Sequence, residues 1–155
     1  MKEALLTVLL GASPISELRG AIPIAFFSWG VPLVKAALLA TIGNLLPVVP
    51  LLVFWNWLAE RLSDHFYYFN RLFAWLSDKT QRNRAWGLGR WESFAVFLVA
   101  AVPLPLFGAW TATLLALIFC IPIKKAALLI SFGVVLSGFI VSIIITASSK
   151  LLTAQ

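Results

Sequence analysis

Two ionisable residues, Glu17 and Arg19, lie inside an otherwise apolar stretch of the chain. An ionised side chain near the centre of a bilayer costs about 2.5–3.5 kcal/mol on insertion scales, so such residues need a partner or a hydrated cavity. Glu17 could act as a protonatable group facing a polar cavity, and Arg19 could pair with it or hold an anionic group of a substrate. The alternative is that both residues lie in water at a hairpin mouth and only shape the turn.

Two glycines, Gly20 and Gly108, follow breaks in apolar segments and could also help to bind a ligand. Helices that begin near them would present unpaired backbone N–H groups and partial positive charge, which bind anions such as phosphate. If the two helix starts meet, they form one site near the bilayer midplane. The other candidate substrate- or proton-binding residues near these breaks are Pro23, Pro103, Pro105 and Trp110. The prolines could equally be turn residues without a ligand.

Asn44 is one more candidate, a polar residue within an apolar span, where an interhelical hydrogen bond is the more common role. The chain offers little for catalysis. Its one histidine, His65, belongs to the polar middle segment, and its one cysteine is Cys120. The sequence contains neither a Cys/His metal cluster nor a Gly-rich nucleotide loop, so we expect no enzyme, no metal and no cofactor.

The composition, 61% hydrophobic and 12% charged, leaves too few polar side chains to cover a soluble domain. Four apolar blocks are separated near the middle by a polar and aromatic segment at 60–92; the blocks span 4–30, 33–59, 93–120 and 126–149. The second and fourth blocks can each cross a hydrocarbon core, which takes roughly 20 apolar residues. We therefore expect an all-α integral membrane protein with a single membrane domain, 1–155.

The second and fourth blocks also begin alike. PLVKAALLATIG (32–43) aligns without a gap on PIKKAALLISFG (122–133), and seven of the twelve positions are identical, including Pro, Lys and Gly. Each copy follows an interrupted apolar block. The chain is therefore predicted to contain two repeats, 1–59 and 93–155, an organisation that is common in transporters.

The first and third blocks are interrupted by SPISELRG (13–20) and PLPLFG (103–108). The two arms of the first block, 4–13 and 21–30, would each reach about 15 Å, half of a hydrocarbon core of about 30 Å. Prolines make a continuous helix costly at these points. We therefore favour two re-entrant helical hairpins, each followed by a transmembrane helix, over four kinked spans.

The distribution of Lys and Arg orients the chain but does not choose between these two models. In both, residues 60–92 are cytoplasmic, with eight basic residues on that side and three on the other. With hairpins, the two repeats are inverted and both termini are extracytoplasmic. Apolar residues at spacings of three and four between Leu58 and Leu76 further predict an amphipathic interfacial helix, or a helix packed on the protein's own cytoplasmic face.

Three motifs, SELRGAIPIA (16–25), IGNLLPVVPLL (42–52) and AVPLPLFGAWTATLLA (101–116), resemble those of the small multi-drug export family. That family is similar to the DedA superfamily, which has paired re-entrant hairpins. The resemblance implies a multi-pass transporter in the inner (plasma) membrane of a prokaryote, with DedA-like relatives tied to polyprenyl-phosphate recycling and membrane homeostasis. The matching residues are Glu17, Arg19, Gly20 and Pro23 in the first motif, Asn44 and Pro47 in the second, and Pro103, Pro105, Gly108, Ala109 and Trp110 in the third.

One departure from the family pattern concerns the tip of the third block. The family usually reads PLPGTGAW, whereas Leu106 and Phe107 replace the Gly-Thr pair here. A bulkier, wholly apolar tip argues against a phosphate-cradling role for that loop.

The leading functional hypothesis is a transporter or lipid flippase for an amphipathic substrate, such as a polyprenyl-phosphate-type lipid or a drug, with proton coupling at Glu17. The alternatives are a cationic drug/proton antiporter and a non-transporting factor for membrane homeostasis or assembly, in which the amphipathic segment is the active part. We expect membrane lipids rather than nucleic acid as partners, because basic residues beside apolar runs set membrane orientation. We also expect a homodimer, because two hairpins and two spans are few elements to surround a polar path.

Overall fold

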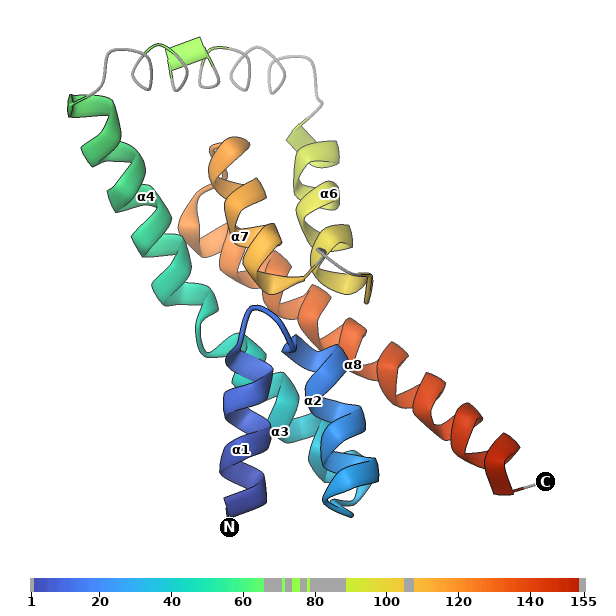
Figure 1. Cartoon of the computed structure of the whole chain (residues 1–155). Coiled ribbons are helices and arrows are strands. Elements are labelled where there is room, and N and C mark those ends of the chain that lie inside the picture. Colours follow the sequence, from blue (N-terminus) through green and yellow to red (C-terminus); the bar gives the residue numbers. More distant parts are fainter. Residues whose placement is uncertain are drawn as a thin grey trace.

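The computed structural model describes residues 2–65, 71, 74–75, 78, 89–104 and 108–153. Within these ranges every regular element is a helix, which confirms the predicted all-α class. The elements in chain order are α1 (Lys2–Ala12), α2 (Glu17–Pro23), the π-helix η1 (Ile24–Ser28), α3 (Leu33–Leu45), α4 (Val48–His65), α6 (Gly89–Ala101), α7 (Ala109–Ile118) and α8 (Ile123–Thr153) (Figure 1).

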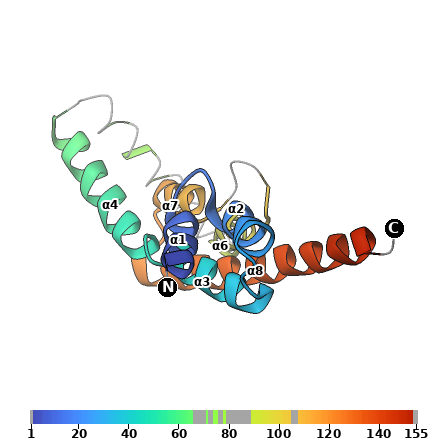
Figure 2. The ribbon, with the colours of Figure 1, turned by 60° about the horizontal axis from the view of Figure 1, so that its bottom comes forward.

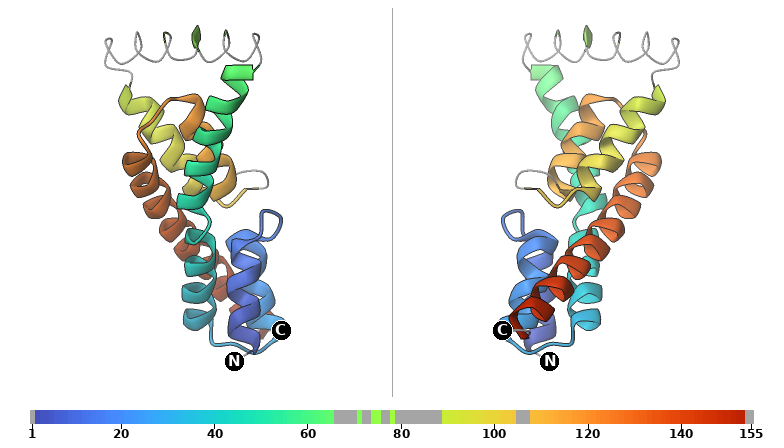
Figure 3. Two further views of the ribbon diagram at one scale, coloured as in Figure 1. Left: turned by 90° about the vertical axis from the view of Figure 1, so that its left-hand side faces the viewer. Right: turned by 90° about the vertical axis from the view of Figure 1, so that its right-hand side faces the viewer.

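Two pairs of short helices lie antiparallel and side by side. α1 and α2 form the first pair, and α6 and α7 form the second. The chain reverses at 13–16 in the first pair and between α6 and α7 in the second. Figures 1 and 3 show that the turn at 13–16 lies next to the facing ends of α6 and α7 near the middle of the molecule, while the open ends of the pairs point to opposite ends. We call the turn at 13–16 the first hairpin tip and the described residues 102–104 and 108 the second hairpin tip.

Two longer helical rods support the pairs. α3 and α4 follow one another with a turn at 46–47. This turn contains Pro47, whose ring removes a backbone hydrogen-bond donor. α8 is a single helix of 31 residues. By length and composition, Leu33–Ser63 and Ile123–Lys150 could each cross a membrane. Figure 2 shows that α4 and the C-terminal half of α8 extend away from the centre on opposite sides.

Small buried residues let the helices approach closely. Ala21, Ala36, Ala40, Ala112 and Ala126 have no exposed surface, and they belong to α2, α3, α7 and α8. Such small side chains are typical of helix contacts within membranes, where backbone proximity and dispersion contribute to association. The core therefore lies where the short helices meet α3 and the first half of α8.

The two segments that align in the sequence also have the same burial. Residues 31–44 and 121–134 have identical patterns of buried, half-buried and exposed positions. Gly43 and Gly133, which align, serve the same purpose. A Cβ at Gly43 would collide with the backbone oxygen of Val8 in α1, and a Cβ at Gly133 would lie 2.8 Å from the backbone oxygen of Phe97 in α6.

The boundaries of the polar middle segment differ from the prediction. α4 continues to His65 and α6 begins at Gly89, so both edges of the segment 60–92 are parts of these helices. Leu58 and Leu62, the start of the predicted amphipathic stripe, belong to α4, because no proline or glycine after Pro50 interrupts this helix before His65. The remainder of that stripe, Phe66, Phe69, Phe73 and Leu76, lies outside the described residues.

Candidate functional site

The hairpin tips meet through Glu17 and Gly108. The Glu17 carboxylate lies so close to Gly108 that a Cβ built there would overlap it. Gly108 has an extended backbone, with φ of 166°, so glycine is needed here for space rather than for its conformational freedom. The carboxylate from the first half of the chain thus fills the space that a side chain at position 108, in the second half, would need.

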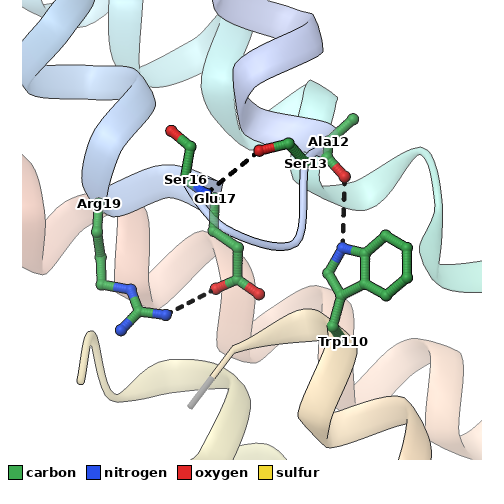
Figure 4. A network of polar contacts seen from close by, with 6 residues as sticks. All are labelled: Ala12, Ser13, Ser16, Glu17, Arg19 and Trp110. Atoms are coloured by element: carbon green, nitrogen blue, oxygen red, sulfur yellow. Dashed lines mark hydrogen bonds and ion pairs between the residues drawn. The ribbon is translucent and has the colours of Figure 1, made fainter. Parts of the chain in front are cut away.

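The Glu17 carboxylate also closes the N-terminal end of α7. It accepts a hydrogen bond from the backbone N–H of Trp110, in the first turn of that helix. The first N–H groups of a helix have no partner within the helix, and the helix dipole favours a negative charge there. On its other side the carboxylate is 3.1 Å from Nη2 of Arg19 (Figure 4). One buried carboxylate therefore satisfies a helix end and a guanidinium group.

The backbone of Glu17 is strained. Its φ is +46°, in the left-handed region that residues with a Cβ rarely adopt. This conformation costs of order 1–3 kcal/mol and persists only where surrounding contacts impose it. Here the Glu17 N–H donates to the Ser13 backbone oxygen at 3.1 Å, and the Ser16 N–H donates to Ser13 Oγ at 3.2 Å. These bonds within the tip, together with the carboxylate contacts, hold the strained residue in place.

Trp110 makes a second link between the hairpins. Its indole Nε1 donates to the backbone oxygen of Ala12, the last residue of α1, at 3.3 Å (Figure 4). Backbone oxygens at a helix end have no donor within the helix. The first hairpin thus supplies the Glu17 carboxylate as acceptor for the first turn of α7, and α7 supplies the Trp110 indole N–H as donor for the end of α1.

An open pocket of about 650 Å³ lies beside this contact. It is lined by Pro14, Ile15, Ser16, Glu17, Arg19, Gly20, Trp110 and Thr111. Glu17 is buried, whereas the Arg19 side chain is 24% exposed. The pocket therefore combines a charged pair, an indole ring and apolar tip residues.

Sequence reasoning did not single out Ser16, which lines the pocket and whose Oγ is buried without a hydrogen-bond partner. The signal was available, since Ser16 begins the motif SELRG. An unpaired buried hydroxyl beside an open pocket can donate to or accept from a ligand. Ser16 joins the site on these grounds.

The predicted role of Gly20 as the start of a helix is wrong. α2 begins at Glu17, and the Gly20 N–H already donates to the Ser16 backbone oxygen at 2.9 Å. The physical reason is that the left-handed turn at Glu17 starts the helix one turn earlier than the glycine suggested. Gly20 instead leaves room for Ser16, because a Cβ there would collide with Ser16 Oγ.

The remaining candidates are not among the residues lining the pocket. Pro23 lies within α2 directly before η1. Asn44 is buried near the end of α3, and its Oδ1 has no hydrogen-bond partner. Pro103 follows α6 at the second tip. Pro105 lies outside the described residues, as do Leu106 and Phe107.

Comparison with known proteins gives one match. Residues 17–140 match the family described as small multi-drug export proteins. This range contains Glu17 and every site residue that the sequence predicted, and it begins directly after Ser16. No curated protein and no solved structure matches the chain.

Proposed function

We propose, from the premise that this chain belongs to the small multi-drug export family, that it is a multi-pass transporter in the inner membrane of a prokaryote. In this proposal the two hairpins are re-entrant and enter from opposite sides, so that the chain forms two inverted repeats. The opposed directions of the hairpins and the matching burial of 31–44 and 121–134 support it. The transported substrate is amphipathic, and it binds in the pocket at the tips.

The observation that carries the mechanism is the place of the Glu17 carboxylate. It occupies the positive end of α7 and pairs with Arg19 at 3.1 Å, in the way that a bound anion would. An anionic headgroup entering the pocket competes with Glu17 for the same donors. Protonated Glu17 no longer competes for them, so anion binding is coupled to proton uptake at one position.

The apolar part of the substrate has a surface on which to lie. Residues next to the tips are apolar, and the exposed faces of α4 and α8 present large side chains, including Phe54 at 45% and Phe139 at 65% exposure. Such faces suit lipid tails. A phosphate carried on a long hydrocarbon chain, as in a polyprenyl phosphate, meets both requirements, and movement of its headgroup past the tips would be a flippase reaction.

A second candidate is export of a cationic drug in exchange for protons. The pocket contains a carboxylate and the indole ring of Trp110, and both attract cations. The family name also points to drug export. Arg19 opposes this alternative, because its positive charge faces the same pocket.

Binding of two labelled probes by the purified protein in lipid nanodiscs separates these candidates. The probes are a polyprenyl phosphate and a lipophilic phosphonium cation. We expect the wild type to prefer the phosphate, and Arg19→Ala to weaken phosphate binding roughly 10- to 100-fold, the value of one charge-assisted hydrogen bond. Arg19→Lys should recover only part of this loss, because lysine lacks the planar fork that binds two oxygens.

Arg90→Lys is the matched control, since Arg90 is exposed at the start of α6, away from the tips. A preference for the phosphonium cation would support drug export instead. Equal phosphate affinity in the wild type and both Arg19 variants would remove Arg19 from the site. The topology is tested separately with reporters fused after Gln155 and at Arg82, which should report opposite sides of the membrane.

A further inference from the structure

The face that carries the hairpin tips is unusual for a surface inside a membrane. Ile15, at the first tip, is 95% exposed, and Leu104, at the second tip, is 52% exposed. Between these apolar residues the pocket opens onto Arg19, which is 24% exposed. Figure 3 shows the first tip midway between the two ends of the molecule, next to the ends of α6 and α7 that flank the second tip.

The lengths of the hairpin arms place this face deep in the bilayer, if the hairpins are re-entrant as proposed above. α1 has 11 residues and α7 has 10. These helices are about 16 and 15 Å long, so the tips lie near the middle of a hydrocarbon core of about 30 Å. A single copy would therefore present irregular backbone and the partly exposed Arg19 side chain sideways to lipid tails.

Lipid tails cannot supply hydrogen bonds to the backbone groups and the charged side chain of this face. Irregular backbone at membrane depth is tolerated only against protein or a water-filled cavity, and each charged group near the midplane costs about 2.5–3.5 kcal/mol. The exposed surfaces of α4 and α8 pose no such difficulty. In the middle of these helices the large exposed residues, such as Val53 and Ile143, are apolar, and the exposed charged residues lie near the helix ends. The tip face is thus the part of the described lateral surface that needs a protein cover.

A second copy of this chain fits as the cover. A two-fold axis along the membrane normal brings the same residues together at the same depth, so an apolar tip meets an apolar tip. Glu17 is buried within its own chain, so only the exposed part of Arg19 faces the partner subunit's pocket instead of lipid tails. The two open pockets of about 650 Å³ then join into one.

We infer that the protein is a homodimer formed through its hairpin-tip faces, and that the polar site at Glu17 and Arg19 is closed off from lipid by the partner subunit. The inference rests on the membrane placement in the proposed function. It does not depend on the substrate or on proton coupling. The path past the tips is then enclosed by four hairpins rather than two.

Cysteine cross-linking in native membranes tests the inference. Cys120 is first replaced by glycine, and a single cysteine is then introduced as Ile15→Cys at the tip or as Ile143→Cys on α8. The two positions form a matched pair, because both are exposed isoleucines, at 95% and 67%. With a thiol oxidant or a short bifunctional thiol reagent, we expect most of the Ile15→Cys protein to become covalent dimer and Ile143→Cys to stay monomeric.

Two results would overturn the inference. One is equal cross-linking at both positions, which indicates random collision; the other is a monomeric Ile15→Cys protein whose thiol still reacts with a maleimide. Native mass spectrometry of the wild type in lipid particles removes any dependence on the variants. It should give twice the mass of the 17.0 kDa chain, and a monomer carrying bound lipid would contradict the inference. Transport assays on Glu17 variants are separate, so the dimer and the transport mechanism can fail independently.

Discussion

In the first half of the chain the second helix of the hairpin begins with Glu17, and in the second half the corresponding position is Gly108. The correspondence follows from burial, because the buried residues Leu18, Ala21, Ile22 and Ala25 are each 91 positions before Ala109, Ala112, Thr113 and Ala116, which are also buried. Similar scaffolds therefore carry different groups at their tips. One half supplies a carboxylate, and the other supplies the space and the helix end that receive it.

The halves also differ where the hairpin joins the next long helix. In the first half the Val31 N–H donates to the Ala25 backbone oxygen, six residues back, and in the second half the Ile121 N–H donates to the Ala116 oxygen, five residues back. The π-helix η1 accommodates this extra residue directly after Pro23. Single π-helical turns of this kind often lie near functional sites.

The largest expected effect concerns the glycines that the halves share. Gly43→Ala and Gly133→Ala should each destabilise the protein by about 3 kcal/mol, because the added methyl group meets backbone atoms of α1 or α6. Resistance to unfolding by a denaturing detergent in mixed micelles measures this effect. A clearly unequal effect at the two positions would show that the halves do not pack in the same way. Gly30→Ala is the reference for a glycine without a packing contact, because a Cβ there meets nothing within 4 Å and only the left-handed backbone, with φ of +63°, opposes the change, by about 1 kcal/mol.

Gly108→Ala tests the position at which the halves differ. The added methyl group would overlap the Glu17 carboxylate and push it off the end of α7. We expect a loss of stability of about 1–3 kcal/mol. We also expect a lower affinity for the labelled polyprenyl phosphate, because the methyl group takes the space at the end of α7 in which the carboxylate, or a headgroup competing with it, would lie. If both properties match those of the wild type, the close contact between the tips does not form in the membrane.

The smallest expected effect compares the turns that precede α3 and α8. Gly30 and Cys120 occupy equivalent positions and have φ of +63° and +48°. A side chain is disfavoured in this conformation, so Cys120→Gly should stabilise the protein by about 0.5–1 kcal/mol and Gly30→Ala should destabilise it by about 1 kcal/mol. The same detergent titration measures the stability of both variants. If both substitutions stabilise the protein, or both destabilise it, the turns at Gly30 and Cys120 do not have the same backbone conformation.

Part of the site could be predicted from the sequence. Prolines and glycines at the two breaks, with Glu17 and Arg19 at the first, predicted two hairpin tips that form one site where they meet, and the family match agrees with the motifs. The contact of Glu17 with Gly108 could not be predicted, because it joins residues from separate halves and depends on how the hairpins pack. The left-handed backbone of Glu17 could not be predicted either. A residue with a Cβ disfavours this conformation, so only contacts with the rest of the fold impose it.

The central claim is that ionised Glu17 and an anionic headgroup compete for Arg19 and the end of α7. The most direct test is the affinity of a labelled prenyl sulfate, whose charge is constant near neutral pH, measured from pH 5 to 9 on the wild type, Glu17→Gln and the control Glu92→Gln. Glu92 is a buried carboxylate at the start of α6, away from the tips. The account predicts that affinity falls with rising pH in the wild type and in Glu92→Gln, by at most roughly tenfold per pH unit. It predicts a flat profile in Glu17→Gln, and a profile in Glu17→Gln that still falls like the wild type's would contradict it.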